Sequence, residues 1–194
     1  MDKMGLFIFR LLLQEKLITK KESSIYLLGI NLLIKYFFSM MILLLFSIIN
    51  DSLKEVLIFC LFFVPLRSYA GGLHLKNEIY CIVVSIAILP LILLFSNQIE
   101  LNRTIYMIIS TLSYLIVLLI GPVDNKNKPF DKKEIKFFTK KLKKICLVQY
   151  GMTLAFYFFG FDKIVRLSSW SIVLNLLSLI LGKYYRMRKH RFIL

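Results

Sequence analysis

One stretch of the chain, residues 67–81, brings together side chains that could carry out nucleophilic chemistry. It contains His74, one of two histidines in the protein, and Cys81, which follows seven residues later. A cysteine thiolate becomes an effective nucleophile near neutral pH when an imidazole takes its proton or stabilises its charge. The pair therefore predicts Cys81 as a nucleophile and His74 as its base.

The spacing of these two residues requires the backbone around them to turn. On one continuous helix, seven residues rise about 10.5 Å, so the imidazole and the sulfur would not touch. Gly71 and Gly72 favour a turn, because glycine tolerates positive φ and destabilises a helix interior. We expect His74 on a loop and Cys81 in the first turns of the next helix. The alternative interpretation is structural: an interfacial histidine, an apolar filler cysteine, an ordinary turn, and Arg67 as an anchor at the membrane surface.

The other cysteines and Ser68 are weaker candidates. Cys60 and Cys146 have no histidine near them in the sequence, which predicts structural roles. The three cysteines form no CxxC pair, so we expect free thiols and neither a disulfide framework nor a zinc site. Ser68 has no base nearer than His74, which disfavours a serine hydrolase. The sequence therefore predicts no metal and no other cofactor.

The composition indicates that lipid, not water, surrounds most of this chain. Of its 194 residues, 58% are hydrophobic and only 19% are charged, which leaves too little polar surface to cover a soluble domain. The apolar residues form runs close to the roughly 17–25 residues that a helix needs to cross a bilayer. The sequence therefore predicts an all-α polytopic membrane protein with about six transmembrane helices, at Leu32–Asn50, Leu53–Leu66, Ile79–Ser96, Thr104–Val123, Ile145–Phe161 and Leu167–Leu181.

The distribution of positive charge predicts the orientation of these spans. The chain has 26 Lys and Arg residues and a net charge of +15. Four basic segments alternate along the chain with three segments that hold only Lys54, Arg103, Lys163 and Arg166. Cytoplasmic segments of membrane proteins are enriched in Lys and Arg, so we expect both termini on the cytoplasmic side of the cell membrane. This pattern indicates contact with anionic lipids rather than with nucleic acid.

The chain is predicted to form one membrane domain with short flanking segments. Residues 1–31 should form an amphipathic interfacial helix and the start of a second helix that runs into the first span, residues 32–182 the six-span bundle, and residues 183–194 a basic cytoplasmic tail. Gly121-Pro122 should end the fourth span, and a basic helix should run from Asp131 into the fifth. The second span has 14 residues, about 21 Å of helix, so we expect the catalytic loop at residues 67–81 to dip below the headgroups.

The motif in this loop resembles the signature of a known family. The pattern Arg67-x-x-Ala70-Gly71-Gly72-x-His74, followed after six residues by Cys81, resembles that of the accessory gene regulator B (AgrB) family, bacterial membrane cysteine endopeptidases of quorum-sensing systems. The resemblance extends to the chain length, the amphipathic start, the six spans and the Lys- and Pro-containing loop after the fourth span. It implies Cys81 as the nucleophile and His74 as its base, with Arg67, Gly71 and Gly72 binding substrate or shaping the site.

The resemblance also implies a substrate and a reaction. A small membrane-associated propeptide, AgrD-like, would be cleaved near its C-terminus and held on the enzyme cysteine as a thioester. The propeptide's own Cys or Ser would then attack the thioester and release a thiolactone or lactone ring. The resemblance further suggests a homodimer in the bacterial cell membrane.

The residues themselves leave two other functions open. One is a peptide export permease or channel without proteolytic activity, and the other is an enzyme that acts on lipids or their headgroups. Span interiors without ionisable residues disfavour ion-coupled transport, and the absence of a clustered acidic metal site disfavours most headgroup phosphotransferases.

Overall fold

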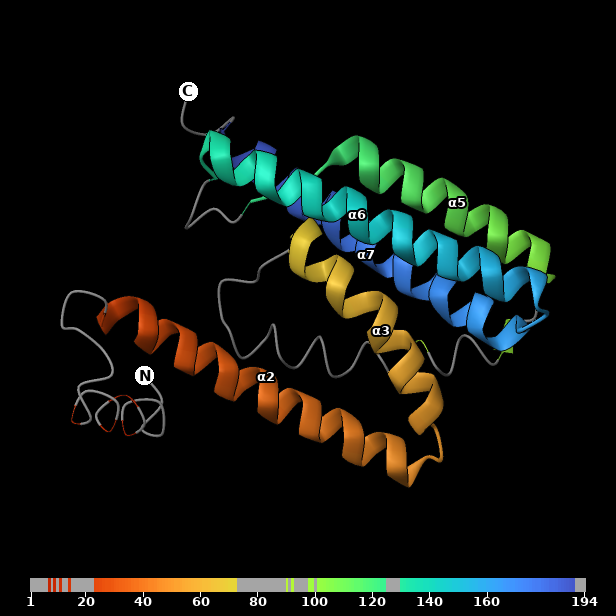
Figure 1. Cartoon of the computed structure of the whole chain (residues 1–194), viewed down its shortest axis with the longest axis horizontal. Helices are drawn as coiled ribbons and strands as arrows, with labels where there is room; N and C mark the ends of the chain where they lie inside the picture. Colours follow the sequence, from red (N-terminus) through yellow and green to blue (C-terminus); the bar gives the residue numbers. More distant parts are fainter. Residues whose placement is uncertain are drawn as a thin grey trace. The chain divides into compact units, whose positions relative to one another are not determined.

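The computed structural model describes residues 7, 9, 11, 14, 23–72, 90, 92, 98, 99, 101–124 and 130–190. The regular elements in this part of the chain are α-helices (Figure 1), which agrees with the all-α prediction. The chain divides into two units, Met1–Asp51 and Ser52–Leu194, each described by itself. The helices are α2 (Ser23–Ile49) in the first unit and α3 (Leu53–Ala70), α5 (Arg103–Ile120), α6 (Lys132–Phe158) and α7 (Asp162–His190) in the second.

Helix α2 contains the predicted first span. It runs for 27 residues, from Ser23 to Ile49. One helix therefore joins the second helix that was predicted to start within residues 1–31 to nearly all of the first span, Leu32–Asn50. Its described exposed side chains are mainly large and apolar, among them Leu33, Phe37 and Ile48. Such a surface suits lipid contact, because water would be ordered around it at a cost in free energy.

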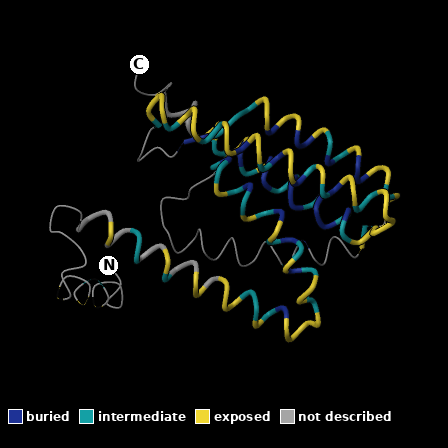
Figure 2. Tube along the Cα trace, in the orientation of Figure 1, coloured by how far each residue is buried: buried dark blue, intermediate teal, exposed yellow. Residues whose placement is uncertain are grey.

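The second unit is a bundle of α3, α5, α6 and α7. Both α6 and α7 pack against α3 and α5, and α6 also packs against α7. Buried residues face inward between these helices, and exposed residues face outward (Figure 2). The buried cluster draws on all four helices and the segment after α5: Leu66, Ala70, Tyr114, Val117, Val123, Leu142, Cys146, Ile172, Leu176 and Leu179.

Polar contacts at one end of this bundle show which helix ends meet there. Lys163 at the start of α7 pairs with Glu55 at the start of α3. Arg103 at the start of α5 pairs with Asp162 at 3.2 Å, and its guanidinium carbon lies 5.0 Å from the centre of the Tyr157 ring at the end of α6. Helices α3, α5 and α7 therefore begin where α6 ends. The residues 67–72 must lie at the opposite end, with the start of α6.

Two helices in the described part of the chain are long and apolar enough to cross a membrane, at Arg103–Ile120 and Asp162–Tyr185. They overlap the predicted fourth and sixth spans. Helices α2, α3 and α6 overlap the predicted first, second and fifth spans, while the third lies almost entirely outside the described residues. The count of six transmembrane helices stays a prediction.

The observed helix ends follow hydrogen-bonding signals rather than the limits of the apolar runs. As predicted, α5 ends before Gly121, and α6 begins after Asp131, whose side chain forms a capping box with Glu134. Helix α3, however, continues four residues past the predicted end at Leu66, so residues 67–70 of the predicted loop are helical. Its 18 residues rise about 27 Å, and the short-span argument for a dipping loop no longer holds.

A buried amide compensates for a proline inside α3. Pro65 has no N–H, so the carbonyl of Leu61, four residues earlier, lacks its helical donor. Gln149 on α6, only 5% exposed, supplies a donor: its Nε2 lies 3.2 Å from the Leu61 oxygen and 2.9 Å from the Phe62 oxygen. The side chain therefore ties α6 to α3 at the proline.

Replacing Gln149 with leucine is expected to lower the free energy of unfolding by about 1–2 kcal/mol, because it leaves the Leu61 carbonyl without a donor inside the bundle. Pro65→Ala restores the missing N–H. It should therefore stabilise the Gln149→Leu protein more than it stabilises the wild type, as measured by denaturant titration in detergent micelles. Equal effects of Pro65→Ala in the two backgrounds would show that Gln149 does not serve this carbonyl.

Candidate functional site

Three of the five predicted site residues lie in the described part of the chain. Arg67 is in the last turn of α3, and Gly71 and Gly72 directly follow this helix. His74 and Cys81 lie outside the described residues. The described part of the site is therefore the turn that leads into the predicted catalytic pair.

The two glycines turn the chain out of α3. Gly71 has φ of 74°, and its N–H donates to the carbonyl of Arg67 at 3.2 Å, which caps the helix. Gly72 has φ of 135° and is buried. Side chains with a Cβ rarely adopt such values, so the prediction of a glycine-dependent turn is confirmed.

The segment after α5 holds one side of this turn. The N–H of Val123 donates to the carbonyl of Ala70 at 2.9 Å, and Gly71 and Val123 form an isolated parallel bridge. A Cβ on Gly71 would lie 2.1 Å from the Val123 oxygen, a distance that no side chain allows. The next residue, Asp124, accepts a hydrogen bond from the Phe130 N–H at 3.1 Å, just before α6 begins. The turn is thereby joined to the ends of two other helices.

Arg67 fastens the turn to α7. Its Nη1 donates to the Gly71 carbonyl and to the Ser178 Oγ, each at 2.6 Å. A cation in the last turn of a helix also interacts favourably with the helix dipole. These contacts support a site-shaping role for Arg67, one of the two roles considered from the sequence.

A close contact between Gly182 of α7 and the backbone of Gly72 also holds the turn in place. A Cβ on Gly182 would lie 2.5 Å from the carbonyl carbon of Gly72, so only a glycine lets α7 approach the turn this closely. A Cβ on Gly72 would in turn lie 2.8 Å from the Ser178 Oγ. Ser178 and Gly182 are four residues apart, on one face of α7. The sequence analysis missed both, although small residues at this spacing in an apolar helix are a known signal of close packing.

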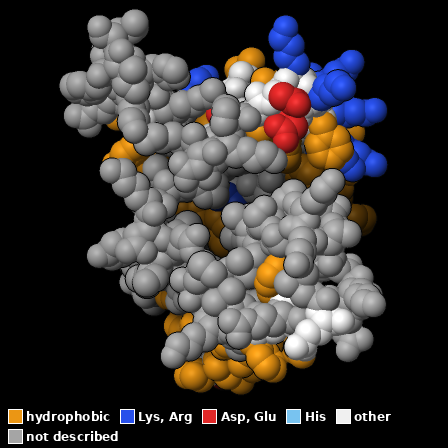
Figure 3. Space-filling view, turned by 90° about the vertical axis from the view of Figure 1, so that its left-hand side faces the viewer, with side chains coloured by type: hydrophobic (Ala, Val, Ile, Leu, Met, Phe, Trp, Pro, Cys, Tyr) orange, Lys and Arg blue, Asp and Glu red, His pale blue; other side chains and the backbone are white. Residues whose placement is uncertain are grey.

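The start of α6 adds aromatic and basic side chains to this end of the bundle. The rings of Tyr69 and Phe138 have centroids 6.2 Å apart, and Phe138 stacks on Phe130 at 4.6 Å. Lys and Arg side chains gather on one part of the face drawn in Figure 3. Along the first half of α6 the exposed lysines are Lys132, Lys133, Lys136, Lys140, Lys141, Lys143 and Lys144.

The cysteines outside the motif lie in packed surroundings. Cys146 is 2% exposed and belongs to the buried cluster, and Cys60 on α3 is half-buried. Both are free thiols. Their positions fit the structural roles expected for them.

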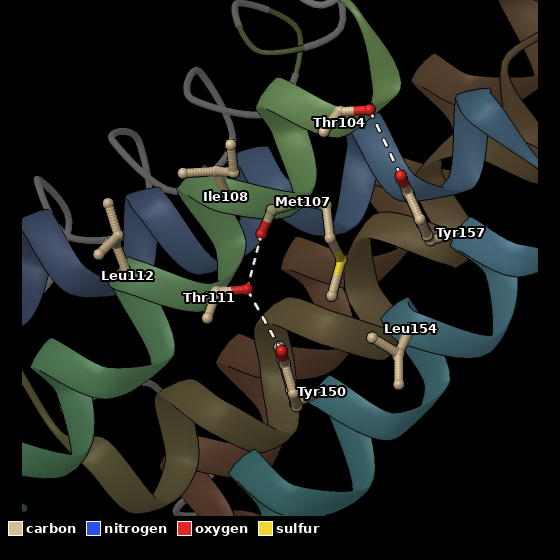
Figure 4. A pocket seen from close by; sticks show the side chains of 8 residues that line it. All are labelled: Thr104, Met107, Ile108, Thr111, Leu112, Tyr150, Leu154 and Tyr157. Carbon is tan, nitrogen blue, oxygen red and sulfur yellow. Dashed lines mark hydrogen bonds between the residues drawn. The ribbon is translucent and has the colours of Figure 1, made fainter.

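An open cavity of about 300 Å³ lies between α5 and α6, away from the glycine turn (Figure 4). Its lining is mostly apolar, with two hydroxyl pairs that face each other across it: Thr104 with Tyr157, and Thr111 with Tyr150, both at 3.3 Å. Among the described residues that line it there is no cysteine, histidine, carboxylate or amine. These residues therefore include no base that could activate one of the hydroxyls as a nucleophile. Among the described residues, no cluster of three or more His, Cys, Asp or Glu is placed to hold a metal ion.

The comparisons with known proteins agree with the motif. The family model for accessory gene regulator B matches residues 7–179. An AgrB-like protein of Clostridium acetobutylicum is 28% identical over 170 residues, which cover 82% of this chain and 78% of the relative. AgrB-like protein 2 of Clostridium perfringens is 32% identical over 123 residues, which cover 60% of this chain and 56% of the relative. An AgrB-like protein of Clostridium beijerinckii is 33% identical over 85 residues, which cover 42% of this chain and 43% of the relative.

The chain thus spans about half the length of these last two relatives. No solved structure matches it. The family model, however, covers most of the chain and includes the whole of residues 67–81. The protein therefore belongs to the accessory gene regulator B family.

Proposed function

We propose that this protein is an integral membrane cysteine endopeptidase that removes the C-terminal part of a small quorum-sensing propeptide and promotes cyclisation of the remainder. Family membership supports a role in processing such a peptide. The observation that carries the proposal furthest is the turn at Gly71 and Gly72, which Arg67, Val123 and α7 hold in place. His74 follows Gly72 by two residues, so a catalytic histidine at this position would be attached to a backbone segment that is held in place.

The proposed reaction has two acyl-transfer steps. The Cys81 thiolate attacks the carbonyl carbon of the scissile peptide bond, the C–N bond breaks, and the C-terminal fragment leaves as an amine that takes a proton from His74. The propeptide's own Cys or Ser then gives its proton to His74, which is neutral again, and attacks the thioester carbonyl. The C–S bond breaks, the Cys81 thiolate is restored, and a thiolactone or lactone ring is released. The ring forms in preference to hydrolysis when water is partly excluded and the attacking group is held near the thioester.

The proposed surroundings follow from the charge of the bundle. We place the end with residues 67–72 and the lysines of α6 on the cytoplasmic side, with both termini, because basic segments of membrane proteins face the cytoplasm. These lysines would contact anionic lipid and attract an acidic propeptide tail. A homodimer with six spans in each subunit is part of the same proposal.

The proposal predicts a covalent intermediate. Co-expressed with a candidate propeptide that carries an internal Cys or Ser and an acidic C-terminal tail, the wild type should release the C-terminal fragment. It should carry the remaining part as an adduct that hydroxylamine removes, as it removes thioesters. Mass spectrometry of the propeptide and of the intact membrane protein measures both. An uncut propeptide that still appears outside the cells would contradict the proposal and support the export permease instead.

A further inference from the structure

The glycine turn touches α7 at two residues that the motif does not include. Ser178 accepts the Arg67 hydrogen bond at 2.6 Å, and Gly182 lies against the backbone of Gly72. We propose that Ser178 and Gly182 are positioning residues for the catalytic histidine, acting through Arg67 and Gly72. This inference rests on the proposed function, because it concerns the geometry of the same reaction.

The contacts define how the positioning works. Arg67 uses one nitrogen, Nη1, to bond both the Gly71 carbonyl and the Ser178 Oγ, so the serine fixes where the guanidinium sits over the turn. A Cβ on Gly72 would lie 1.9 Å from this nitrogen, so the guanidinium occupies the space above the glycine. A shift of Arg67 therefore moves Gly72 or leaves it unsupported.

Gly182 limits the turn by a contact with its backbone. Its added Cβ would lie 2.5 Å from the carbonyl carbon of Gly72 and 2.9 Å from both its Cα and its oxygen. These are backbone atoms, which cannot rotate out of the way as a side chain can. A methyl group at residue 182 would therefore displace Gly72, two residues before His74. A displacement of about 1 Å in a reacting group can cost a hundredfold in rate.

Ser168 supplies a matched control for Ser178. It lies on the same helix and is 1% exposed, and within the described part of the chain its Oγ donates to the Val165 carbonyl at 2.9 Å, one turn earlier in α7. Ser168→Ala removes an equivalent serine hydroxyl from α7 but leaves the contacts of the glycine turn unchanged. Gly151 is the corresponding control for Gly182, because it lies within α6 and a Cβ there would meet nothing within 4 Å.

The test uses the protein in nanodiscs with a synthetic candidate propeptide that carries an internal Cys or Ser and an acidic C-terminal tail. We expect Ser178→Ala to lower kcat roughly tenfold with KM nearly unchanged, because a hydrogen bond to a charged group is lost. Gly182→Ala should lower kcat by roughly a hundredfold. Ser168→Ala and Gly151→Ala should match the wild type in kcat and in thermal midpoint. Gly182→Ala should also unfold at a lower temperature, because its Cβ forces the backbone of Gly72 to move. The kcat values are therefore compared at a temperature at which all four variants are folded.

A double variant separates positioning from a general structural role. Arg67→Lys removes the guanidinium that Ser178 holds, so adding Ser178→Ala should cost little further activity. A full additional tenfold loss in the double variant would show that Ser178 acts independently of Arg67 and would overturn the inference.

Different results would contradict the positioning role of Ser178 and Gly182 and the proposed peptidase function. If Cys81→Ala abolishes cleavage but Ser178→Ala equals Ser168→Ala, and Gly182→Ala equals Gly151→Ala, the positioning inference alone is wrong. If the wild type leaves the propeptide uncut, or Cys81→Ala cuts as well as the wild type, the proposed function is wrong and this inference falls with it.

Discussion

Cys81→Ala is expected to abolish cleavage of the propeptide, with a fall of at least roughly a thousandfold, because no other group in the mechanism can form the acyl intermediate. His74→Ala should lower the rate by roughly a hundredfold or more, because the thiol then loses its base. Both effects appear as loss of the propeptide's C-terminal fragment when protein and propeptide are co-expressed and the peptides are followed by mass spectrometry.

The chain offers a matched control for each of these variants. Cys60→Ala removes a half-buried thiol of α3, and His190→Ala removes the second histidine, at the end of α7. Both should cleave within about twofold of the wild type, since neither side chain has a part in the proposed mechanism. If Cys60→Ala loses activity and Cys81→Ala does not, Cys60 is the nucleophile. If all four variants cleave equally, the peptidase hypothesis is wrong.

Gly71→Ala is expected to destabilise the protein by about 3 kcal/mol and to remove most of its cleavage activity. Two costs combine. An alanine at φ of 74° pays about 1–2 kcal/mol for the left-handed conformation. Its Cβ would also lie 2.1 Å from the Val123 carbonyl oxygen, and moving this backbone costs about 1–3 kcal/mol more. Thermal unfolding in detergent and propeptide cleavage measure the two consequences.

Gly121→Ala isolates the conformational part of this effect. Gly121 has φ of 72°, ends α5 as Gly71 ends α3, and donates its N–H to the Val117 carbonyl at 3.0 Å. A Cβ at Gly121 would meet nothing within 4 Å. Its alanine variant should therefore lose only about 1–2 kcal/mol and stay active. Equal losses of stability and activity in Gly71→Ala and Gly121→Ala would mean that the close contact of Gly71 with Val123 contributes to neither.

The sequence predicted those parts of the fold that depend on neighbours within one or two helical turns. Gly121-Pro122 marked the end of α5 and Asp131 the start of α6. Both ends are set by local hydrogen bonds: the Gly121 N–H donates to Val117, and Asp131 forms a capping box with Glu134. The end of α3 was placed too early, at Leu66. Hydropathy reports preference for lipid, whereas the helix continues until Gly71, where a positive φ turns the backbone out of the helix.

The residues of the candidate site likewise fall into those that the sequence motif identifies and those that only the structure brings to the site. Arg67, Gly71 and Gly72 were found from the motif, and the positive φ of both glycines followed from their residue type. Ser178 and Val123 could not be found in this way, because each reaches the turn from a segment that is distant along the chain. Arg67 and Ser178 are 111 residues apart, and Leu61 and Gln149 are 88 apart.

The sequence by itself thus determined that the chain is helical and apolar, where most of its helices lie, and which short motif carries the candidate chemistry. These properties follow from side-chain solvation and local backbone preference, which each residue brings with it. Only the tertiary structure decided that α7 and the segment after α5 hold the motif turn, and that α6 supplies the donor missing at Pro65. Those contacts depend on how distant helices pack, and a hydrogen bond between two such residues leaves no periodic signal in the sequence.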